Sequence, residues 1–330
     1  MTKILFVITK RIGDALSVTP SIRAVFFHYP NCEITVYCKK NNKDLFVSNK
    51  YIKKIKVLDS LKARLLSVIQ FNKKFDKCFF YSENKSFLNL AEKNSKKIYA
   101  FESPYFNLSY SQIYYIKRFE PNSRPHIIFE NLRLVEHANI QQHKTHMDLF
   151  LSSQDLSYQK KVFQEIRKRK EKIFCLKIMS DPGKKFRDWS LERFAELINL
   201  IFKYFSHSQI LIVGSNLEEV YARKLELINP KRIHIFCNQS LSKTAAIVFG
   251  ADIYIGVDTG VTQIASCSNK PVIGLYHCLI GKDKSGPLNN ELDYSIEMPI
   301  PKDGCKRING SLDLISAQDV LKKIQEAFRQ

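Results

Sequence analysis

Short apolar runs alternate with longer amphipathic stretches along this chain of 330 residues. The runs have the length and composition of buried strands, and most are followed by apolar positions at helical spacing. Strands are predicted at 3–9, 33–38, 55–58, 76–81, 173–178, 209–213, 233–237, 252–256 and 271–276. Strands that alternate with helices form parallel sheets covered on both faces, so the pattern predicts an α/β protein with two such sheets.

A lysine-rich, charged segment at about 152–172 separates the two groups of strands. It predicts a surface helix and a connector, and we place two domains at residues 1–160 and 161–330. Both lengths are ordinary for a domain, and 45% hydrophobic residues suffice for two cores. The sequence Ser316-Ala317-Gln318-Asp319 begins the last predicted helix with a capping-box pattern.

The loop Asp258-Thr259-Gly260 follows a predicted strand and precedes a short helical segment. Backbone N–H groups at a helix start are unpaired and attract anions such as phosphate. Gly260 lets an anion approach the backbone closely, and Thr259 and Thr262 carry hydroxyl donors. Simple helix capping explains the same residues equally well, because Asp and Thr are common capping residues.

A second polar segment, with Lys10, Arg11, Gly13 and Asp14, follows the first predicted strand. Ligands of open α/β sheets gather at the carboxyl ends of strands, which is where Asp14 falls. Asp14 is therefore a candidate functional carboxylate, and a solvated turn aspartate is the plain alternative. Thr19-Pro20 then predicts the cap and first position of the next helix.

Together these segments resemble the bacterial lipopolysaccharide heptosyltransferases, glycosyltransferase family nine. Residues 4–26 are similar to the start of that family, and 258–276 to its donor loop. Arg187-Asp188-Trp189 resembles its basic-x-Trp segment, in which lysine is usual at the first position. Gly286-Pro287, and Cys305 with Ile308, also match, so the resemblance extends from residue 3 to about 328.

The resemblance implies the GT-B fold, in which two Rossmann-like domains face each other across a cleft. The first domain would bind the acceptor and the second the nucleotide sugar, and the last helix is free to return to the first domain. The implied function is inverting transfer of heptose from ADP-heptose to the inner core of lipopolysaccharide or lipooligosaccharide. A relative that uses another nucleotide sugar or acceptor, and a catalytically silent nucleotide-binding protein, are the alternatives.

Transfer of a sugar needs a base for the acceptor hydroxyl and donors for the departing diphosphate. Asp14 is the candidate base, with Lys10, Arg11 and Gly13 on the acceptor side. The candidate donor-binding residues are Lys184, Lys185, Arg187, Glu218 or Glu219, Asp258, Thr259, Gly260, Thr262 and Gln263. Because cationic side chains and helix dipoles can neutralise a diphosphate, and no Asp-x-Asp pair is present, we expect neither a metal nor another cofactor.

Four positions near this site carry open questions. The family loop commonly reads Asp-Thr-Gly-Pro-x-His, whereas this chain has Val261 and Gln263, and glutamine cannot carry a proton or a positive charge. Trp189 is more typical of core packing than of ligand stacking. His277, just after a predicted strand, would either touch the nucleotide or cap its loop.

The net charge of +20 indicates that the partners of the protein are anionic. Residues 1–150 hold 25 basic and 12 acidic side chains, with lysine clusters at 39–43 and 50–54. We expect an anionic glycolipid acceptor and peripheral contact with the inner-membrane surface. A nucleic-acid-binding protein is the third class of function, but no motif of that class is present, so we expect no nucleic-acid partner.

Two further features concern the expected compartment and the state of the cysteines. Apolar runs are too short to span a bilayer or to form a secretory signal, so we expect a cytoplasmic protein. The eight cysteines show no C-x-x-C pair and no histidine cluster at ligand spacing. We interpret them as buried thiols, with no disulfide and no metal site.

Overall fold

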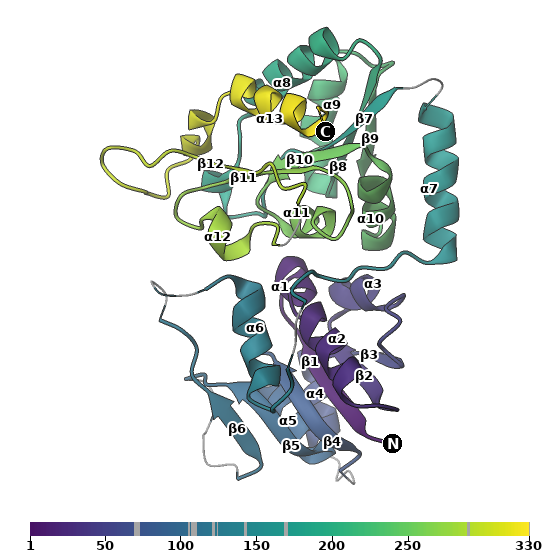
Figure 1. The fold of residues 1–330 in the computed structure, drawn as a ribbon, viewed down its shortest axis with the longest axis vertical. Coiled ribbons are helices and arrows are strands. Elements are labelled where there is room, and N and C mark those ends of the chain that lie inside the picture. Colours follow the sequence, from purple (N-terminus) through teal and green to yellow (C-terminus); the bar gives the residue numbers. More distant parts are fainter. Residues whose placement is uncertain are drawn as a thin grey trace. The chain divides into compact units, whose positions relative to one another are not determined.

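The computed structural model of the chain divides into two compact units, Met1–Phe150 and Leu151–Gln330. The structure describes residues 1–68, 73–104, 106, 111–120, 123, 125–141, 144–167, 171–288 and 291–329. Each unit is an α/β layer structure built on a parallel sheet (Figure 1).

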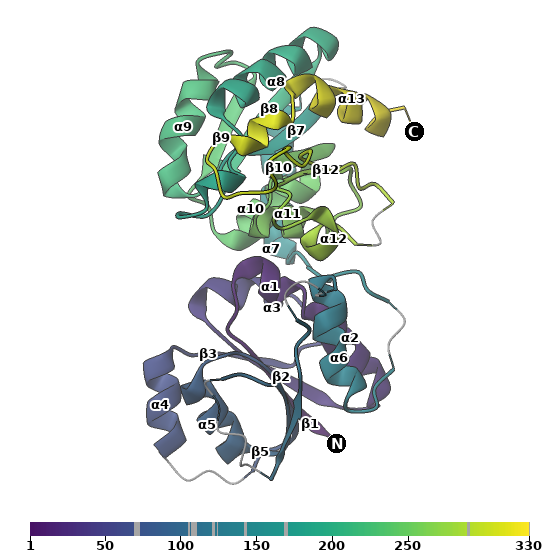
Figure 2. The ribbon, with the colours of Figure 1, turned by 90° about the vertical axis from the view of Figure 1, so that its left-hand side faces the viewer.

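The first unit contains, in its described residues, a six-stranded parallel sheet of order β3-β2-β1-β4-β5-β6. Its strands are β1 Lys3–Ile8, β2 Glu33–Cys38, β3 Lys54–Val57, β4 Phe75–Tyr81, β5 Ser95–Phe101 and β6 Ile113–Ile116. Its helices are α1 Ile12–Leu16, α2 Thr19–His28, α3 Lys43–Phe46, α4 Ser60–Val68, α5 Lys85–Asn94 and α6 Ile127–Glu136. Helices α2 and α6 pack together over one face, and α4 and α5 over the other (Figure 2).

The second unit repeats this topology, because its described strands form a parallel sheet of order β12-β11-β10-β7-β8-β9. Its strands are β7 Lys172–Lys177, β8 Ser208–Gly214, β9 Ile233–Cys237, β10 Ile253–Val257, β11 Val272–Tyr276 and β12 Ile296–Glu297. Its helices are α7 Ser153–Ile166, α8 Leu191–Tyr204, α9 Asn216–Glu226, α10 Leu241–Gly250, α11 Gly260–Ala265, α12 Lys282–Ser285 and α13 Ala317–Ala327. Helices α8, α9 and α13 cover one face, and α7, α10 and α11 the other.

The predicted strands are all present, with ends shifted by at most one residue. Parallel strands covered on both faces are apolar throughout, and β10 and β11 are indeed buried along their whole length. Strands β5, β6 and β12 were not predicted. Strand β5 begins with the polar Ser95-Lys96-Lys97, so its apolar part is only four residues long, and β12 has only two residues.

The boundary and the last helix differ in detail from the expectations. The division lies between 150 and 151, whereas we placed the boundary between 160 and 161. Helix α7 belongs to the second unit because Gln159 Nε2 donates to the carbonyl of Ala246 in α10, at 2.7 Å. Helix α13 begins with the predicted capping box and packs against α8, with Val320 and Ile324 in the core of the second unit.

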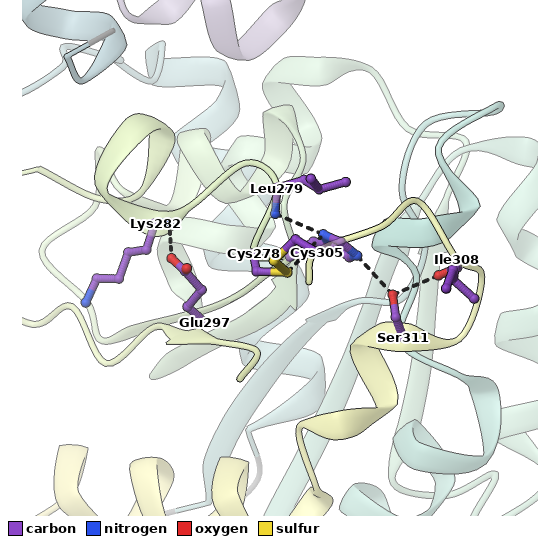
Figure 3. The surroundings of a disulfide bond; sticks show 8 residues. Cys278, Leu279, Lys282, Glu297, Cys305, Ile308 and Ser311 are labelled. Atoms are coloured by element: carbon purple, nitrogen blue, oxygen red, sulfur yellow. Dashed lines mark hydrogen bonds between the residues drawn. A yellow bond between two sulfur atoms is a disulfide. The ribbon is translucent and has the colours of Figure 1, made fainter. Parts of the chain in front are cut away.

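Two cysteines contradict the expectation that every thiol is free. Cys278 and Cys305 form a disulfide, with Cα atoms 6.0 Å apart and a sequence separation of 27 (Figure 3). Neither is fully buried, and their long separation gives no spacing motif. Cys38 and Cys237 are buried free thiols as expected, and burial raises the pKa of Cys38 to about 11 and that of Cys237 to about 12.

The disulfide predicts a stability difference between oxidised and reduced protein. A crosslink restricts the unfolded chain, and a loop of this length is worth about 3 kcal/mol. We expect the double change Cys278→Ser with Cys305→Ser to lower the melting temperature of the second unit by roughly 6–12 °C. Differential scanning calorimetry with and without reductant measures it, and Cys32→Ser is the matched control because Cys32 is a free thiol. Equal melting temperatures with and without reductant would contradict the prediction.

Candidate functional site

The strand order of each sheet places the candidate residues. In both units the winding reverses once, between β1 and β4 and between β7 and β10. Open α/β sheets bind ligands outside the carboxyl ends of the strands at this switch point. Asp14 follows β1, and Asp258 follows β10 beside β7. The two predicted segments therefore lie at the switch points of their own units.

An ion pair stands at the start of the second-unit loop. Arg187 Nη1 lies 2.8 Å from Asp258 Oδ2, and both side chains are largely buried. Arg187 comes from the short 3-10 helix η3 (Lys185–Arg187), so the pair joins the segment after β7 to the end of β10. The Nε of Arg187 is buried and has no hydrogen-bond partner among the described residues. The guanidinium therefore keeps donor capacity beyond the bond to Asp258.

The loop after β10 rests on a chain of buried hydroxyl groups. Thr262 is fully buried, and its hydroxyl donates to the carbonyl of Val257 at 2.6 Å. A hydroxyl has one proton, so Tyr254 OH must be the donor in its 3.0 Å bond to Thr262 Oγ1. Burial raises the pKa of Tyr254, which keeps that donor protonated. Thr262 thus holds the loop through its hydrogen bonds to Val257 and Tyr254. Thr259 and Gly260 instead form the start of α11.

Gly256 makes room for this arrangement. A Cβ at that position would lie 2.6 Å from the hydroxyl oxygen of Tyr254 and 2.8 Å from Cβ of Lys177. Separations this short do not occur between such atoms, so the tyrosine lies across Gly256 only because glycine has no side chain. The glycine was visible in the sequence, but its partner was not.

Glu218 forms a second buried ion pair. Its Oε1 lies 2.5 Å from Nζ of Lys177, and its Oε2 accepts from the backbone N–H of Ser215 at 2.7 Å. This second bond completes a capping box at the start of α9. Lys177 Nζ also donates to the carbonyl of Met179. Glu219, the alternative from the sequence, is more exposed and pairs with Arg223 on its own helix.

The remaining predicted donor-side residues occupy two places. Gln263 is largely buried, and its amide Nε2 donates to the carbonyl of Ser285 at the end of α12. Lys185 is exposed, and Lys184 Nζ lies 3.7 Å from Asp181. Gln263 therefore connects α11 to the turn before Gly286, whereas the two lysines lie on the segment that carries Arg187.

The structure answers both open questions about single aromatic residues. Trp189 is 2% exposed, and its Nε1 donates to the carbonyl of Ile315 at 2.9 Å, so it packs in the core as expected. His277 is 1% exposed, and its Nδ1 accepts from the N–H of Leu279 at 3.1 Å (Figure 3). Its Nε2 therefore carries the proton and donates to Ser311 at 2.9 Å.

His277 consequently caps its loop. Both ring nitrogens are occupied, and burial together with nearby Arg187 lowers the pKa of the ring. A neutral ring of fixed tautomer joins the end of β11 to the 3-10 helix η4 (Ser311–Leu314), beside the disulfide. The sequence alone could not distinguish a histidine that caps this loop from one that contacts a nucleotide, because either would stand directly after a strand.

In the first unit, Asp14 lies on a short helix. It is in the first turn of α1, with an exposed side chain, and its carbonyl accepts from Ser17 Oγ at 2.8 Å. Ser17 accepts in turn from Asn131 Nδ2 at 2.7 Å, and Asn131 Oδ1 accepts from Lys10 Nζ at 3.3 Å. A buried network thus holds the helix that carries Asp14. Arg11 is the exposed residue before α1.

The predicted start of the next helix is off by one position. Val18, not Thr19, precedes α2, so Pro20 occupies its second position. The hydroxyl of Thr19 donates to the carbonyl of Leu16 at 2.8 Å and accepts from the N–H of Asp148 at 2.8 Å. Thr19 therefore connects α1 to a distant segment, which competes with capping.

No helix in the described part of the chain is long and apolar enough to cross a membrane. Among the described side chains, no group of three or more histidine, cysteine, aspartate or glutamate residues is arranged to hold a metal ion.

Comparison with solved structures places the fold. A family 9 glycosyltransferase from Veillonella parvula is 14% identical, with a TM-score of 0.85, over 99% of this chain and 97% of its own. ADP-heptose lipopolysaccharide heptosyltransferase II of E. coli is 17% identical, with a TM-score of 0.81, over 100% and 99%. E. coli heptosyltransferase WaaC, solved with ADP, is 15% identical, with a TM-score of 0.73, over 99% and 100%. The two sheets are thus those of the GT-B fold.

The family is identified from the sequence. No curated protein matches the chain significantly. The family model for glycosyltransferase family 9 (heptosyltransferase) does match, over residues 91–308, which is more than half of the chain. The match includes the Arg187–Asp258 pair, Glu218 and the loop after β10. The chain is therefore a glycosyltransferase that belongs to family 9, the heptosyltransferases.

Proposed function

We propose that this enzyme transfers heptose, with inversion, from ADP-heptose to the inner core of lipopolysaccharide or lipooligosaccharide, at the cytoplasmic face of the inner membrane. The observation that carries the proposal is the buried Arg187–Asp258 pair directly before Thr259 and Gly260, at the switch point of the second sheet. The related E. coli WaaC is described with ADP and with ADP-2-deoxy-2-fluoro heptose, which supports an ADP-linked donor.

The reaction is a single displacement at the anomeric carbon. The acceptor oxygen forms a bond to that carbon while the bond to the β-phosphate oxygen breaks, and ADP leaves with the electron pair. The acceptor proton passes to Asp14, whose exposed carboxylate sits on a helix fixed by Ser17 and Asn131. Lys10, Arg11 and Gly13 surround Asp14 in sequence, and their two cations suit an anionic glycolipid.

The leaving diphosphate requires fixed donors, since negative charge builds on it in the transition state. The N–H groups at the start of α11, the hydroxyl of Thr259 and the guanidinium of Arg187 supply them. Lys184 or Lys185 adds a cation from the same segment as Arg187. Asp258 orients Arg187, and Thr262 and Gln263 act on the donor indirectly, by holding the loop and the turn beside it.

For the ribose we retain Glu218 rather than Glu219. Each oxygen of Glu218 accepts one hydrogen bond within the protein, from Lys177 and from Ser215. An ionised carboxylate has about four acceptor sites, so two remain for ribose hydroxyls. Its position is fixed before the donor arrives, whereas Glu219 is held only by an exposed pair with Arg223.

Titration with a panel of nucleotide diphosphates and nucleotide sugars tests the proposal as a whole. Preference for ADP and ADP-heptose, with transfer to a heptose-deficient inner-core acceptor, is the expected result. Transfer from another nucleotide sugar would favour the first alternative. Binding without transfer from any donor would favour a silent nucleotide-binding protein.

Asp14→Asn should abolish most turnover and leave donor binding nearly intact. Loss of a general base typically costs about 100- to 10,000-fold in rate. Asp44→Asn is the matched control, because Asp44 also lies in the first turn of a short helix in the same unit. Steady-state rates and calorimetric ADP binding measure both effects. A rate for Asp14→Asn within a factor of a few of wild type would exclude Asp14 as the base.

Tyr254→Phe should loosen the donor loop. The change removes the hydrogen bond to Thr262, which is worth about 0.5–1.5 kcal/mol, and we expect the KM for the donor to rise about three- to tenfold with a smaller change in kcat. Tyr276→Phe is the control, because the Tyr276 hydroxyl is equally buried but has no hydrogen-bond partner among the described residues. Similar donor KM values for the two variants would show that the hydroxyl chain does not position the loop.

Gln263→His tests the departure from the family loop. A neutral hydrogen bond is worth about 0.5–1.5 kcal/mol and a charge-assisted one about 1.5–3 kcal/mol. If this is a family enzyme in which Gln263 holds the turn and makes no charged contact with phosphate, the histidine should keep or raise activity with ADP-heptose, most clearly at low donor concentration. Steady-state rates against ADP-heptose and other nucleotide sugars measure the effect.

The contrary outcome for Gln263→His is equally specific. Loss of activity with another donor, and no gain with ADP-heptose, would show that Gln263 is adapted to that other donor. Gln263→Met serves as the control, since it keeps the shape but removes the amide that donates to Ser285.

A further inference from the structure

Helix α4 presents an apolar stripe to solvent. The exposed fractions of Leu61, Leu65 and Val68 are 67%, 61% and 82%. Successive residues of a helix are rotated by about 100°, so positions separated by three, four or seven residues lie on one side. Three large apolar side chains therefore form a continuous outward stripe on a helix of nine residues.

The fold does not use this stripe. The inward side of α4 carries Ala63, which is fully buried, and Leu66, which packs against the core of the first unit. This inward side packs on α5. The helix thus has two apolar sides, and only one of them is explained by the folding of the first unit.

Cationic residues border the exposed stripe. By the same helical rotation, Lys62 lies on one edge of it and Arg64 on the other. Lys62 Nζ lies 4.0 Å from Asp59 Oδ2 in an exposed pair just before the helix, so both cations stay accessible at the surface. The sequence contains no acidic residue between Asp59 and Asp76, and the first unit carries a large excess of basic residues. An apolar stripe with cationic edges is the pattern of helices that lie in the interface of an anionic bilayer.

Helix α9 shows that exposed apolar residues alone do not make this pattern. Val220 is 64% exposed there, and Leu227, just after the helix, is 78% exposed. Their charged neighbours are mixed, because Arg223 pairs with both Glu219 and Glu226. The electrostatic attraction to an anionic surface that α4 offers is therefore missing from α9.

We propose that α4 docks on the anionic phospholipid surface of a membrane. Leu61, Leu65 and Val68 enter the boundary between headgroups and acyl chains, while Lys62 and Arg64 contact lipid phosphates. The inference rests on the proposed function in one respect, since a glycolipid acceptor lies in such a membrane. A second copy of the chain fits less well, because a stable protein interface needs about 800 Å² per partner and this stripe is a single short helix.

Vesicle flotation with the full-length protein tests the proposal. The probes are phosphatidylcholine vesicles with and without phosphatidylglycerol, and the variant is Leu61→Gln with Leu65→Gln. We expect it to bind anionic vesicles roughly tenfold more weakly than wild type. Lys62→Gln with Arg64→Gln should also weaken binding, by about fivefold for each charge at low salt. Val220→Gln with Leu227→Gln is the matched control and should bind as wild type does.

Several outcomes would overturn the proposal. They are absence of wild-type binding to anionic vesicles, equal binding by the Leu61/Leu65 variant, and an equal loss in the α9 control. A wild-type dimer in sedimentation velocity that the Leu61/Leu65 variant abolishes would also overturn it, because the stripe would then be an interface between two copies of the chain. Transfer to a water-soluble acceptor without acyl chains should be the same in wild type and the α4 variants. Vesicle binding needs no nucleotide-sugar donor, so it can be measured even if the enzyme does not catalyse the proposed transfer.

Discussion

The reversal of winding in each parallel sheet is the constraint on which the site depends. Connections from β7 run to the face covered by α8, and those from β10 run to the face covered by α11. Adjacent strands whose connections separate in this way leave their carboxyl ends uncovered, and polar groups at those ends are available to a ligand. Lys177 and Asp258 end these two strands or follow them directly. The chemistry therefore follows from topology before any single side chain is considered.

The buried ions Lys177 and Glu218 at this edge are stabilised because each has more than one partner. Removal of an ion from water costs several kcal/mol, and a single opposite charge does not always repay it. Glu218 is held by Lys177 and by the backbone of Ser215, and Lys177 also donates to the carbonyl of Met179. The first unit uses the same device, since Arg23 pairs with Asp148 and donates to the carbonyls of Lys144 and His146. These networks fix the segments on which the candidate site residues lie.

The sequence predicted most of the features that depend on neighbours along the chain. Runs such as 271–276 identified strands, and Ser316 with Asp319 identified the last helix, because strand burial and capping are local. It could not assign roles that depend on a distant partner. Thr262 was expected to face the ligand, but its partner Tyr254 lies beneath the loop. Likewise Gln263 donates a hydrogen bond to Ser285, and Cys278 forms a disulfide with Cys305. In both cases the two residues are too far apart in the sequence for a spacing motif to predict the contact.

The balance of charge around the loop after β10 limits how that loop could hold a diphosphate. Arg187 is paired with Asp258, and Lys177 with Glu218, so these four residues contribute no net charge to the site. A dianionic group then depends on backbone N–H groups and on the cations of the segment after β7, among which Lys185 is exposed. The family histidine would have added a titratable charge, and Gln263 does not. Affinity for the donor in this chain should therefore depend more on hydrogen-bond geometry and less on pH than in a relative with the histidine.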